Sequence, residues 1–164
     1  MKVQTHNSEL KIISIEDIEV LNPRERNTKI FQDIVGNIKQ IGLKKPITVT
    51  PRKTNEGLTK YLLVCGEGRM KALKYLGETE IPAMIIDIKD EDAFIMSLSE
   101  NIARRQCRPL ELLAGIQRLK DQGYDRKTIA LKTGLSIDYV QGILHLLEYG
   151  EDRLLIGVES AKIP

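Results

Sequence analysis

The stretch Tyr61-Leu62-Leu63-Val64-Cys65-Gly66-Glu67-Gly68-Arg69-Met70-Lys71-Ala72-Leu73-Lys74-Tyr75-Leu76-Gly77 decides how the chain folds. It opens with a short apolar run, residues 61–64, which is long enough for a buried strand. It closes with Met70, Leu73 and Leu76 at three-residue spacing, which is typical of a helix. The stretch therefore predicts a strand, a turn and a helix in succession.

The turn in this stretch carries residues suited to an anion. Gly66 and Gly68 permit backbone conformations that other residues resist, and a turn that leads into a helix leaves backbone N–H groups able to bind an anion. Arg69 adds a positive charge with a planar set of donors that matches a phosphate. We interpret the stretch as a phosphate-binding strand-turn-helix. A tight turn with a solvent-exposed arginine is the alternative, and these residues alone leave both interpretations open.

Composition places the chain among ordinary globular proteins. Its 164 residues are 41% hydrophobic and 29% charged, which is enough for one ordinary domain or two small ones. The two cysteines, Cys65 and Cys107, lie far apart and have no neighbouring metal ligands, so a zinc site is not expected. No apolar run approaches the ~18 residues of a membrane span, and the first residues lack a signal-peptide pattern, so we expect a cytoplasmic protein.

The first half of the chain mixes strands with helices. Residues 1–11 are polar, and we expect them to be flexible. Isoleucines 30, 34, 38 and 41 form one stripe of a helix that Gly42 ends. Further strands are expected at residues 45–51 and 81–88. Residues 12–89 therefore predict a compact α+β domain with a small sheet.

From Asp90 onward the pattern is helical. Asp90 can cap a helix that runs through residues 90–108, and residues 109–164 carry three further helices. Between residues 100 and 135 there are eight arginines and lysines and four acidic residues, although the whole chain has a net charge of only +2. This local excess of positive charge indicates a surface that binds nucleic acid.

The last two of these helices predict a helix-turn-helix. Asp125 and Ser136 are suitable helix caps, and Gly134 suits the tight turn between them. The residues expected to contact double-stranded DNA are Arg126, Lys127, Thr133, Ser136, Asp138, Tyr139 and Gln141. A helical hairpin within a bundle is the alternative. Duplex binding that does not weaken with rising salt would exclude the DNA interpretation.

Two motifs in this order resemble those of the ParB partition proteins, in particular their plasmid RepB-like branch. Residues 66–72, Gly-Glu-Gly-Arg-Met-Lys-Ala, match the family pattern Gly-Glu-Arg-Arg-x-Arg-Ala. Residues 100–104, Glu-Asn-Ile-Ala-Arg, match the pattern Glu-Asn-x-x-Arg. The segment at residues 42–47 and the helix-turn-helix follow in the family order, so the resemblance extends from Ile12 to Pro164.

This resemblance implies a nucleotide-dependent DNA-binding protein. Family members bind CTP with Mg²⁺ in the N-terminal domain and recognise a centromere-like DNA site with the helical domain. They form homodimers that close as clamps on DNA, they stimulate a ParA-type ATPase, and some hydrolyse CTP. Such a protein would be associated with the nucleoid or a plasmid in the cytoplasm, with no membrane partner.

The resemblance also implies which residues bind the nucleotide. Gly66 to Arg69 would surround the phosphates with help from Arg104, and Glu100 with Asn101 would offer oxygen ligands to Mg²⁺. Residues 43–47 would lie against the base and ribose, and Arg24 near the triphosphate. The nucleotide-binding set is therefore Arg24, Leu43, Lys45, Pro46, Ile47, Gly66, Glu67, Gly68, Arg69 and Arg104.

The chain departs from the family pattern at three positions. Gly68 replaces the first arginine of the motif, Lys71 replaces the third, and Lys45 replaces a frequent glutamine. A planar donor group is thus lost and another becomes a point charge, so the sequence predicts CTP binding and leaves open whether CTP is hydrolysed to reopen the clamp. The chain also stops at Pro164, where family members continue into a C-terminal dimerisation domain, so we expect it to be truncated there.

Two other functions stay open at this stage. A transcriptional regulator with a degenerate nucleotide pocket would explain the arginine lost at Gly68. The N-terminal fold is also similar to sulfiredoxin and to a free-serine kinase. Sulfiredoxin needs a cysteine where this chain has Glu67, whereas a small-molecule phosphotransferase could use Glu67 as a base.

Overall fold

The structure is a computed structural model that describes residues 8–20, 27–55, 57–104 and 108–150. The chain forms two compact units, Met1–Phe94 and Ile95–Pro164, and each is described by itself. Within the described residues no helix is both long enough and apolar enough to cross a membrane.

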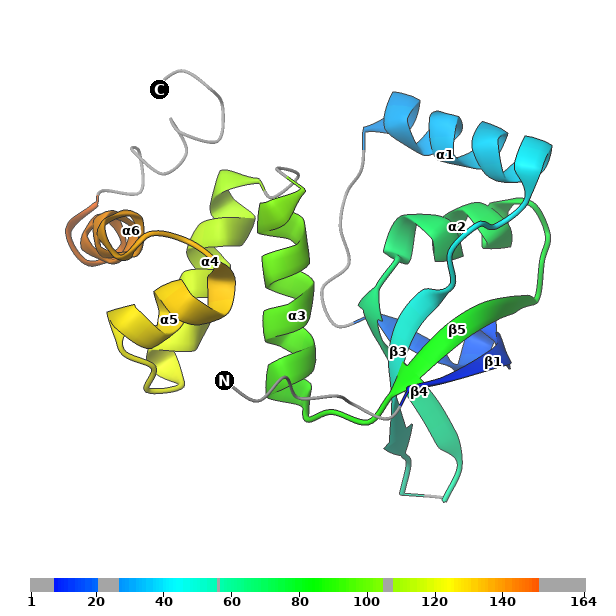
Figure 1. Ribbon diagram of the computed structural model, residues 1–164, viewed down its shortest axis with the longest axis horizontal. Helices are drawn as coiled ribbons and strands as arrows, with labels where there is room; N and C mark the ends of the chain where they lie inside the picture. Colours follow the sequence, from blue (N-terminus) through cyan, green and yellow to red (C-terminus); the bar gives the residue numbers. More distant parts are fainter. Residues whose placement is uncertain (1–7, 21–26, 56, 105–107, 151–164) are drawn as a thin grey trace. The chain divides into compact units, whose positions relative to one another are not determined.

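The first unit is an α+β domain built on a five-stranded sheet (Figure 1). The strand order is β1-β5-β3-β4-β2, and the sheet is mixed, because β3 pairs parallel with β5 and antiparallel with β4. The elements in chain order are β1 Ser8–Ser14, a 3-10 turn Ile15–Asp17, β2 Ile18–Val20, α1 Thr28–Ile41, β3 Ile47–Lys53, β4 Thr59–Cys65, α2 Glu67–Tyr75 and β5 Glu80–Ile86. The predicted α+β class is confirmed.

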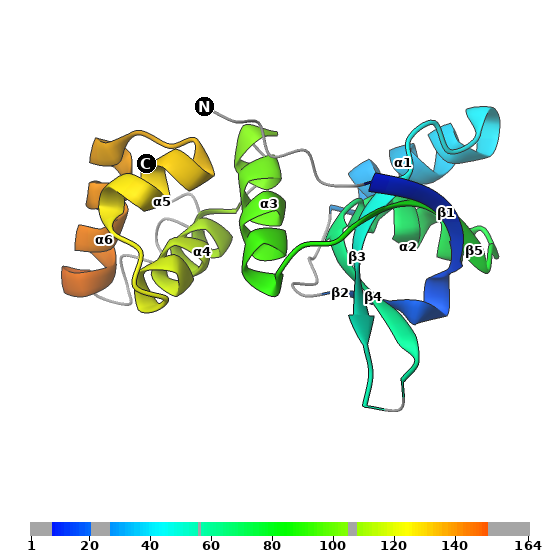
Figure 2. The same ribbon diagram turned by 60° about the horizontal axis from the view of Figure 1, so that its bottom comes forward.

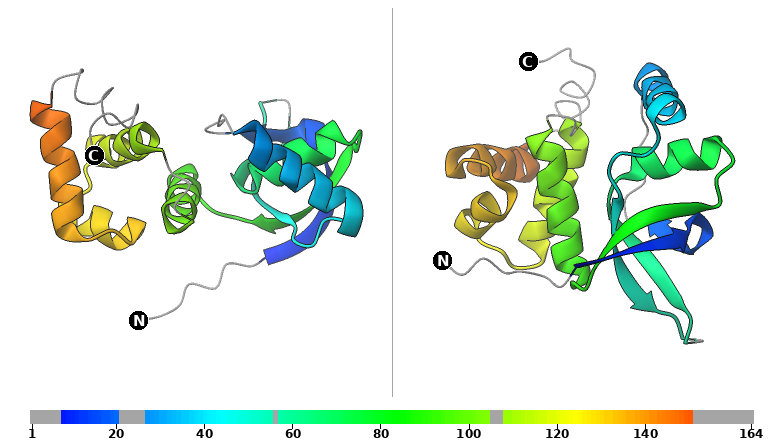
Figure 3. Two further views of the ribbon diagram at one scale, coloured as in Figure 1. Left: turned by 90° about the horizontal axis from the view of Figure 1, so that it is seen from above. Right: turned by 45° about the vertical axis from the view of Figure 1, so that its right-hand side comes forward.

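Both helices of this unit lie on the same side of the sheet (Figure 3). Met70 and Leu73 of α2 pack against the central strands, in a core that also contains Ile47, Val49, Leu63, Ile81 and Ala83. Alternate side chains of a strand point to opposite faces, so Val64 and Ile86 form a second core with Ala93 in the first turn of α3, Asp90–Ala103. Packing in these cores thus fixes β4 and α2, the two elements that the turn at Gly66 joins.

The helix α1 packs more loosely than its sequence pattern predicts. Gly42 ends it with a φ of 72°, as expected. Its fully buried residue is Val35, whereas Ile30 and Ile41 at its two ends are 48% and 50% exposed. The helix α1 has 14 residues and packs on α2, which has 9, so the ends of α1 extend beyond the surface that could cover them.

The expectation that residues 1–11 are flexible is wrong from Ser8 onward. Residues 8–14 form β1, which pairs antiparallel with β5 along its whole length. The side chains of Leu10 and Ile12 are exposed, so the strand is held by backbone hydrogen bonds and by Ile13, which is buried in the core. Pairing with a strand some seventy residues away leaves no signal in the mostly polar residues at the start of β1.

The second unit is all helical and contains the greater part of α3 together with α4 Pro109–Asp121, α5 Arg126–Thr133 and α6 Ile137–Tyr149. Figure 2 shows α4, α5 and α6 grouped together. Their buried residues are Leu113, Ile116 and Leu119 of α4, Ile129 and Ala130 of α5, and Val140 and Ile143 of α6. Gly115 lets α4 approach Leu98, because a Cβ at this glycine would lie 2.9 Å from the leucine methyl groups.

The predicted caps of the last two helices are confirmed. The carboxylate of Asp125 accepts a hydrogen bond from the backbone N–H of Thr128 at 2.7 Å. The hydroxyl of Ser136 accepts one from the N–H of Tyr139 at 3.2 Å. Gly134 ends α5 in a left-handed conformation with a φ of 75°, so three residues suffice to join the two helices.

Candidate functional site

The turn between β4 and α2 requires a glycine at residue 66. Its φ is 108°, a conformation that L-residues with side chains resist. A Cβ at this position would also lie 2.7 Å from Cγ2 of Ile47, a fully buried residue of β3. The backbone of the turn therefore lies directly against the start of the neighbouring strand.

The first turn of α2 begins at this glycine. The carbonyl of Gly66 accepts hydrogen bonds from the N–H groups of Arg69 and Met70 at 3.0 and 3.1 Å, and no side chain among the described residues caps the helix there. The carboxylate of Glu67 is 7% exposed and forms an ion pair with Lys71 at 2.7 Å. Gly68 is buried too, so the predicted phosphate-binding residues form a tightly packed turn at the positive end of a helix dipole.

Arg69 connects this turn to the segment that precedes β3. Its Nη1 donates hydrogen bonds to the backbone carbonyl of Lys45, at 2.8 Å, and to that of Pro46. The two stretches predicted to hold the nucleotide, residues 43–47 and 66–69, are therefore adjacent. The sequence predicts that Arg69 faces a phosphate. In the structure, Nη1 of its guanidinium instead donates to two backbone carbonyls. These hydrogen bonds place the positive charge of Arg69 between the two stretches.

The other predicted nucleotide-binding residues of this unit differ in exposure. Lys45 is exposed, and Leu43 is half-buried against the core. Ile47 is fully buried, so its side chain belongs to the core and only its backbone could lie beside a ligand. Arg24 lies outside the described residues.

The predicted metal ligands lie in the last turns of α3, in the second unit. Glu100 forms an ion pair with Arg104 at 2.5 Å, and Asn101 is buried. The described part of the chain has no group of three or more histidine, cysteine or acidic side chains that could hold a metal ion by itself. Since these residues and the Gly66 turn belong to different units, their contribution to one site is a proposal.

The predicted DNA-contacting residues lie on α5, on α6 and at the turn between them. Arg126 and Lys127 are exposed on the first turn of α5, and Asp138, Tyr139 and Gln141 are exposed on α6. Thr133 is 3% exposed, and its hydroxyl donates a hydrogen bond to the carbonyl of Ile129 at 2.7 Å. Its side chain is committed to the helix interior, which removes Thr133 from the candidate interface.

The charge distribution at the start of α5 affects its cap. The pKa of Asp125 is lowered from its ordinary value by hydrogen bonds from Thr128 and, to a lesser extent, by the charges of Lys127 and Arg126. The carboxylate thus stays ionised, which suits its position at the positive end of the helix dipole.

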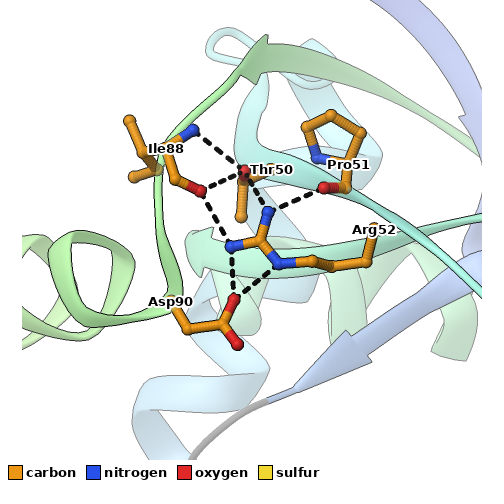
Figure 4. A network of polar contacts seen from close by, with 5 residues as sticks. All are labelled: Thr50, Pro51, Arg52, Ile88 and Asp90. Atoms are coloured by element: carbon orange, nitrogen blue, oxygen red, sulfur yellow. Dashed lines mark hydrogen bonds and ion pairs between the residues drawn. The ribbon is translucent and has the colours of Figure 1, made fainter.

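One polar network in the first unit has no counterpart in the sequence prediction (Figure 4). The hydroxyl of Thr50, in β3, is fully buried and lies within hydrogen-bonding distance of the backbone N–H and carbonyl of Ile88, at 3.3 and 3.1 Å. Arg52 donates from Nη1 to Thr50 at 3.0 Å, from Nη2 to the carbonyl of Ile88 at 2.8 Å, and from Nε to Asp90 at 2.5 Å. Asp90 therefore does not act as the predicted cap but ties the first turn of α3 to the sheet. The sequence signal that could have indicated this network is Thr50, a polar residue among the apolar residues of β3.

Comparison with protein families gives a match over the whole of the first unit and the start of the second. The model of the ParB N-terminal domain matches residues 1–102. The probable chromosome-partitioning protein ParB of Neisseria meningitidis serogroup A is 34% identical over 146 residues, which are 87% of this chain and 50% of that protein. The chromosome-partitioning protein Spo0J of Thermus thermophilus is 30% identical over 137 residues, 81% of this chain and 49% of that protein. The chain thus spans about half the length of these curated relatives.

Two solved structures share the fold over most of the chain. The C-terminally truncated ParB of Caulobacter crescentus complexed to the centromeric parS site has a TM-score of 0.69 at 20% identity, covering 94% of this chain and 80% of that one. The same protein complexed with CTP-gamma-S has a TM-score of 0.51 at 24% identity, covering 94% and 86%. At these identities the likeness shows the fold alone.

Proposed function

The chain belongs to the ParB N-terminal domain family, and from this premise we propose that it is a DNA-binding partition protein whose first unit binds CTP. The observation that carries the proposal is the Gly66 turn. It leads into the N-terminus of α2, where no side chain of the described residues forms a cap hydrogen bond, and Arg69 holds it beside residues 43–47. The proposal is further supported by relatives named as chromosome-partitioning proteins and by the Caulobacter fold, which has been solved with CTP-gamma-S.

In this proposal the nucleotide phosphates bind at the turn of residues 66–69. Backbone N–H groups at the start of α2 and the positive charge of Arg69 provide the attraction. The buried carboxylate of Glu67 is paired with the partly exposed Lys71, which offsets its negative charge beside the bound anion. Because Gly68 stands in place of an arginine, the proposal covers CTP binding and does not extend to its hydrolysis.

Glu100 and Asn101 fit a magnesium ion that accompanies the nucleotide. A carboxylate and an amide provide oxygen ligands, which this cation prefers, and Mg²⁺ usually takes its remaining ligands from phosphates and water. Two protein ligands are therefore compatible with this ion, although they would not suffice for a cation held by protein alone. When bound, the ion would neutralise phosphate charge. Arg104 would orient the carboxylate of Glu100 through their ion pair.

The second unit would bind double-stranded DNA through α5 and α6 as a helix-turn-helix. The exposed N-terminal part of α6 presents Asp138, Tyr139 and Gln141, while Arg126 and Lys127 add positive charge at the start of α5. Such contacts predict an affinity that falls as salt rises. We also propose a homodimer that closes on DNA as a clamp and stimulates a ParA-type ATPase.

The test of nucleotide binding is calorimetric titration of the whole chain with CTP, ATP and GTP in the presence of Mg²⁺. We expect CTP binding, lost in Arg69→Ala and kept in Lys74→Ala, which removes an exposed charge at the far end of the same helix. Site-specific DNA binding should survive Arg69→Ala. Unchanged CTP affinity in Arg69→Ala would contradict the assigned site.

A second candidate follows from Gly68, since loss of the family arginine suits a transcriptional regulator that no longer uses its nucleotide pocket. Specific DNA binding by a chain that binds no nucleotide would support this candidate instead.

A further inference from the structure

Arg126 and Gln141 contact each other across the turn between α5 and α6. Arg126 is the first residue of α5, and Gln141 lies in the second turn of α6. Nη1 of the arginine donates a hydrogen bond to Oε1 of the glutamine, and both residues are exposed. Two of the proposed DNA contacts therefore belong to one side-chain pair.

This pairing fixes the orientation of the glutamine amide. An arginine side chain has only donors, so the atom of the Gln141 amide that faces it must be the carbonyl oxygen. The Nε2 amino group of the Gln141 amide is then the group available to contact a base. The remaining N–H groups of the Arg126 guanidinium add further donors next to it.

A glutamine held in this way reads a base differently from a free one. A free glutamine recognises adenine with both ends of its amide, because the carbonyl oxygen accepts a hydrogen bond from N6 and the amino group donates one to N7. Here Oε1 already accepts from a cation, and the same cation repels the adenine amino group. Guanine presents two acceptors, O6 and N7, in the major groove and therefore matches a surface made of donors.

Resting on the proposed DNA-binding function, we propose that Arg126 and Gln141 act as a single donor unit that selects guanine over adenine at one position of each half-site. Arg126 is both a base contact and the residue that positions Gln141. The competing role for Arg126 is a phosphate contact, which would raise affinity for every sequence alike.

The experiment starts by selecting duplexes bound by the whole chain from a randomised pool. Affinities are then measured for the selected duplex and for variants with guanine replaced by adenine or cytosine at each position. The proteins compared are the wild type, Arg126→Ala, Gln141→Ala, the double variant and Gln141→Glu. Lys127→Ala, the exposed neighbour of Arg126, is the control, and thermal unfolding checks that each variant folds.

We expect one position at which the wild type prefers guanine by about 5- to 150-fold, the range of a good bidentate contact. Arg126→Ala and Gln141→Ala should lose preference at this same position, and the double variant should lose no more than the larger single effect. Gln141→Glu keeps an acceptor for Arg126 but removes the amino group. It should lose the guanine preference and gain binding to cytosine, which presents a donor. Lys127→Ala should weaken binding to all sequences alike and reduce the salt slope by about one.

Three results would overturn the inference. Arg126→Ala could lower affinity uniformly and reduce the salt slope, as a phosphate contact would. The position at which Gln141→Ala loses base preference could be one where the wild type prefers adenine. Alternatively, Gln141→Glu could keep the preference for guanine. Any of these would leave the proposed DNA binding intact, whereas a wild-type chain that selects no duplex would refute both proposals.

Discussion

Substitution of Gly66 by alanine tests the geometry of the candidate nucleotide site. The φ of 108° would cost an L-residue about 1–2 kcal/mol. The added Cβ would lie 2.7 Å from Cγ2 of Ile47, whereas ordinary contacts start at 3.4 Å, so a fully buried side chain must move. Such overpacking costs about 1–3 kcal/mol. Together the two terms predict that the free energy of unfolding falls by about 2–5 kcal/mol in Gly66→Ala.

A second glycine separates the two terms. Gly77 also has a positive φ, 87°, but nothing lies within 4 Å of a Cβ built there, so Gly77→Ala should lose only the backbone term of about 1–2 kcal/mol. Urea unfolding of both variants gives the difference. In an Ile47→Leu background, which removes the obstructing Cγ2, the additional cost of Gly66→Ala should shrink towards that of Gly77→Ala.

The result that would refute this reasoning is equal destabilisation by Gly66→Ala and Gly77→Ala, with no relief from Ile47→Leu. The turn would then not lie against β3 as described. Since the same approach brings residues 43–47 beside the turn, Gly66→Ala should also weaken CTP binding at temperatures where the variant is fully folded.

Three further predictions concern the two units. Thr50→Val should lower the free energy of unfolding by about 1–3 kcal/mol, because it removes the acceptor of the Ile88 N–H and one of the two acceptors of Arg52 Nη1, which keeps the carbonyl of Pro51. Thr50→Ser should recover most of that loss in urea unfolding, and a fully stable Thr50→Val would contradict the network. Ser136→Ala should cost about 1 kcal/mol through loss of the α6 cap, and an unchanged urea midpoint would exclude that role. The lowered pKa of Asp125 means that its contribution to stability is present above its ordinary value of 3.8 and is lost as pH falls below that value towards the lowered pKa. Wild type should therefore lose more thermal stability between pH 7 and pH 3 than Asp125→Asn.

Local signals accounted for most of the elements. Gly42 ends its helix where the sequence predicts, and Asp125 and Ser136 cap helices as expected. Each of these features depends on residues within a few positions of one another, which is why the sequence alone could predict them.

Features that depend on distant residues could not be predicted in this way. The contact of Arg69 with the carbonyl of Lys45 joins residues 24 apart, and that of Arg52 with Asp90 joins residues 38 apart. The glycines of residues 66–69 indicated an anion site, but the use of Arg69 to hold residues 45 and 46 required the sheet. The pairing of Arg126 with Gln141 likewise arises only when α5 and α6 pack together.

The proposed function joins site-specific DNA binding to a CTP-binding unit in a single chain. The most direct measurement is the lifetime of the complex between the chain and its selected duplex, across a range of salt, with Mg²⁺ and either CTP, ATP, GTP or no nucleotide. We predict selective binding that weakens with salt and a lifetime that CTP alone changes. A lifetime that is identical with CTP and without nucleotide would contradict the claim.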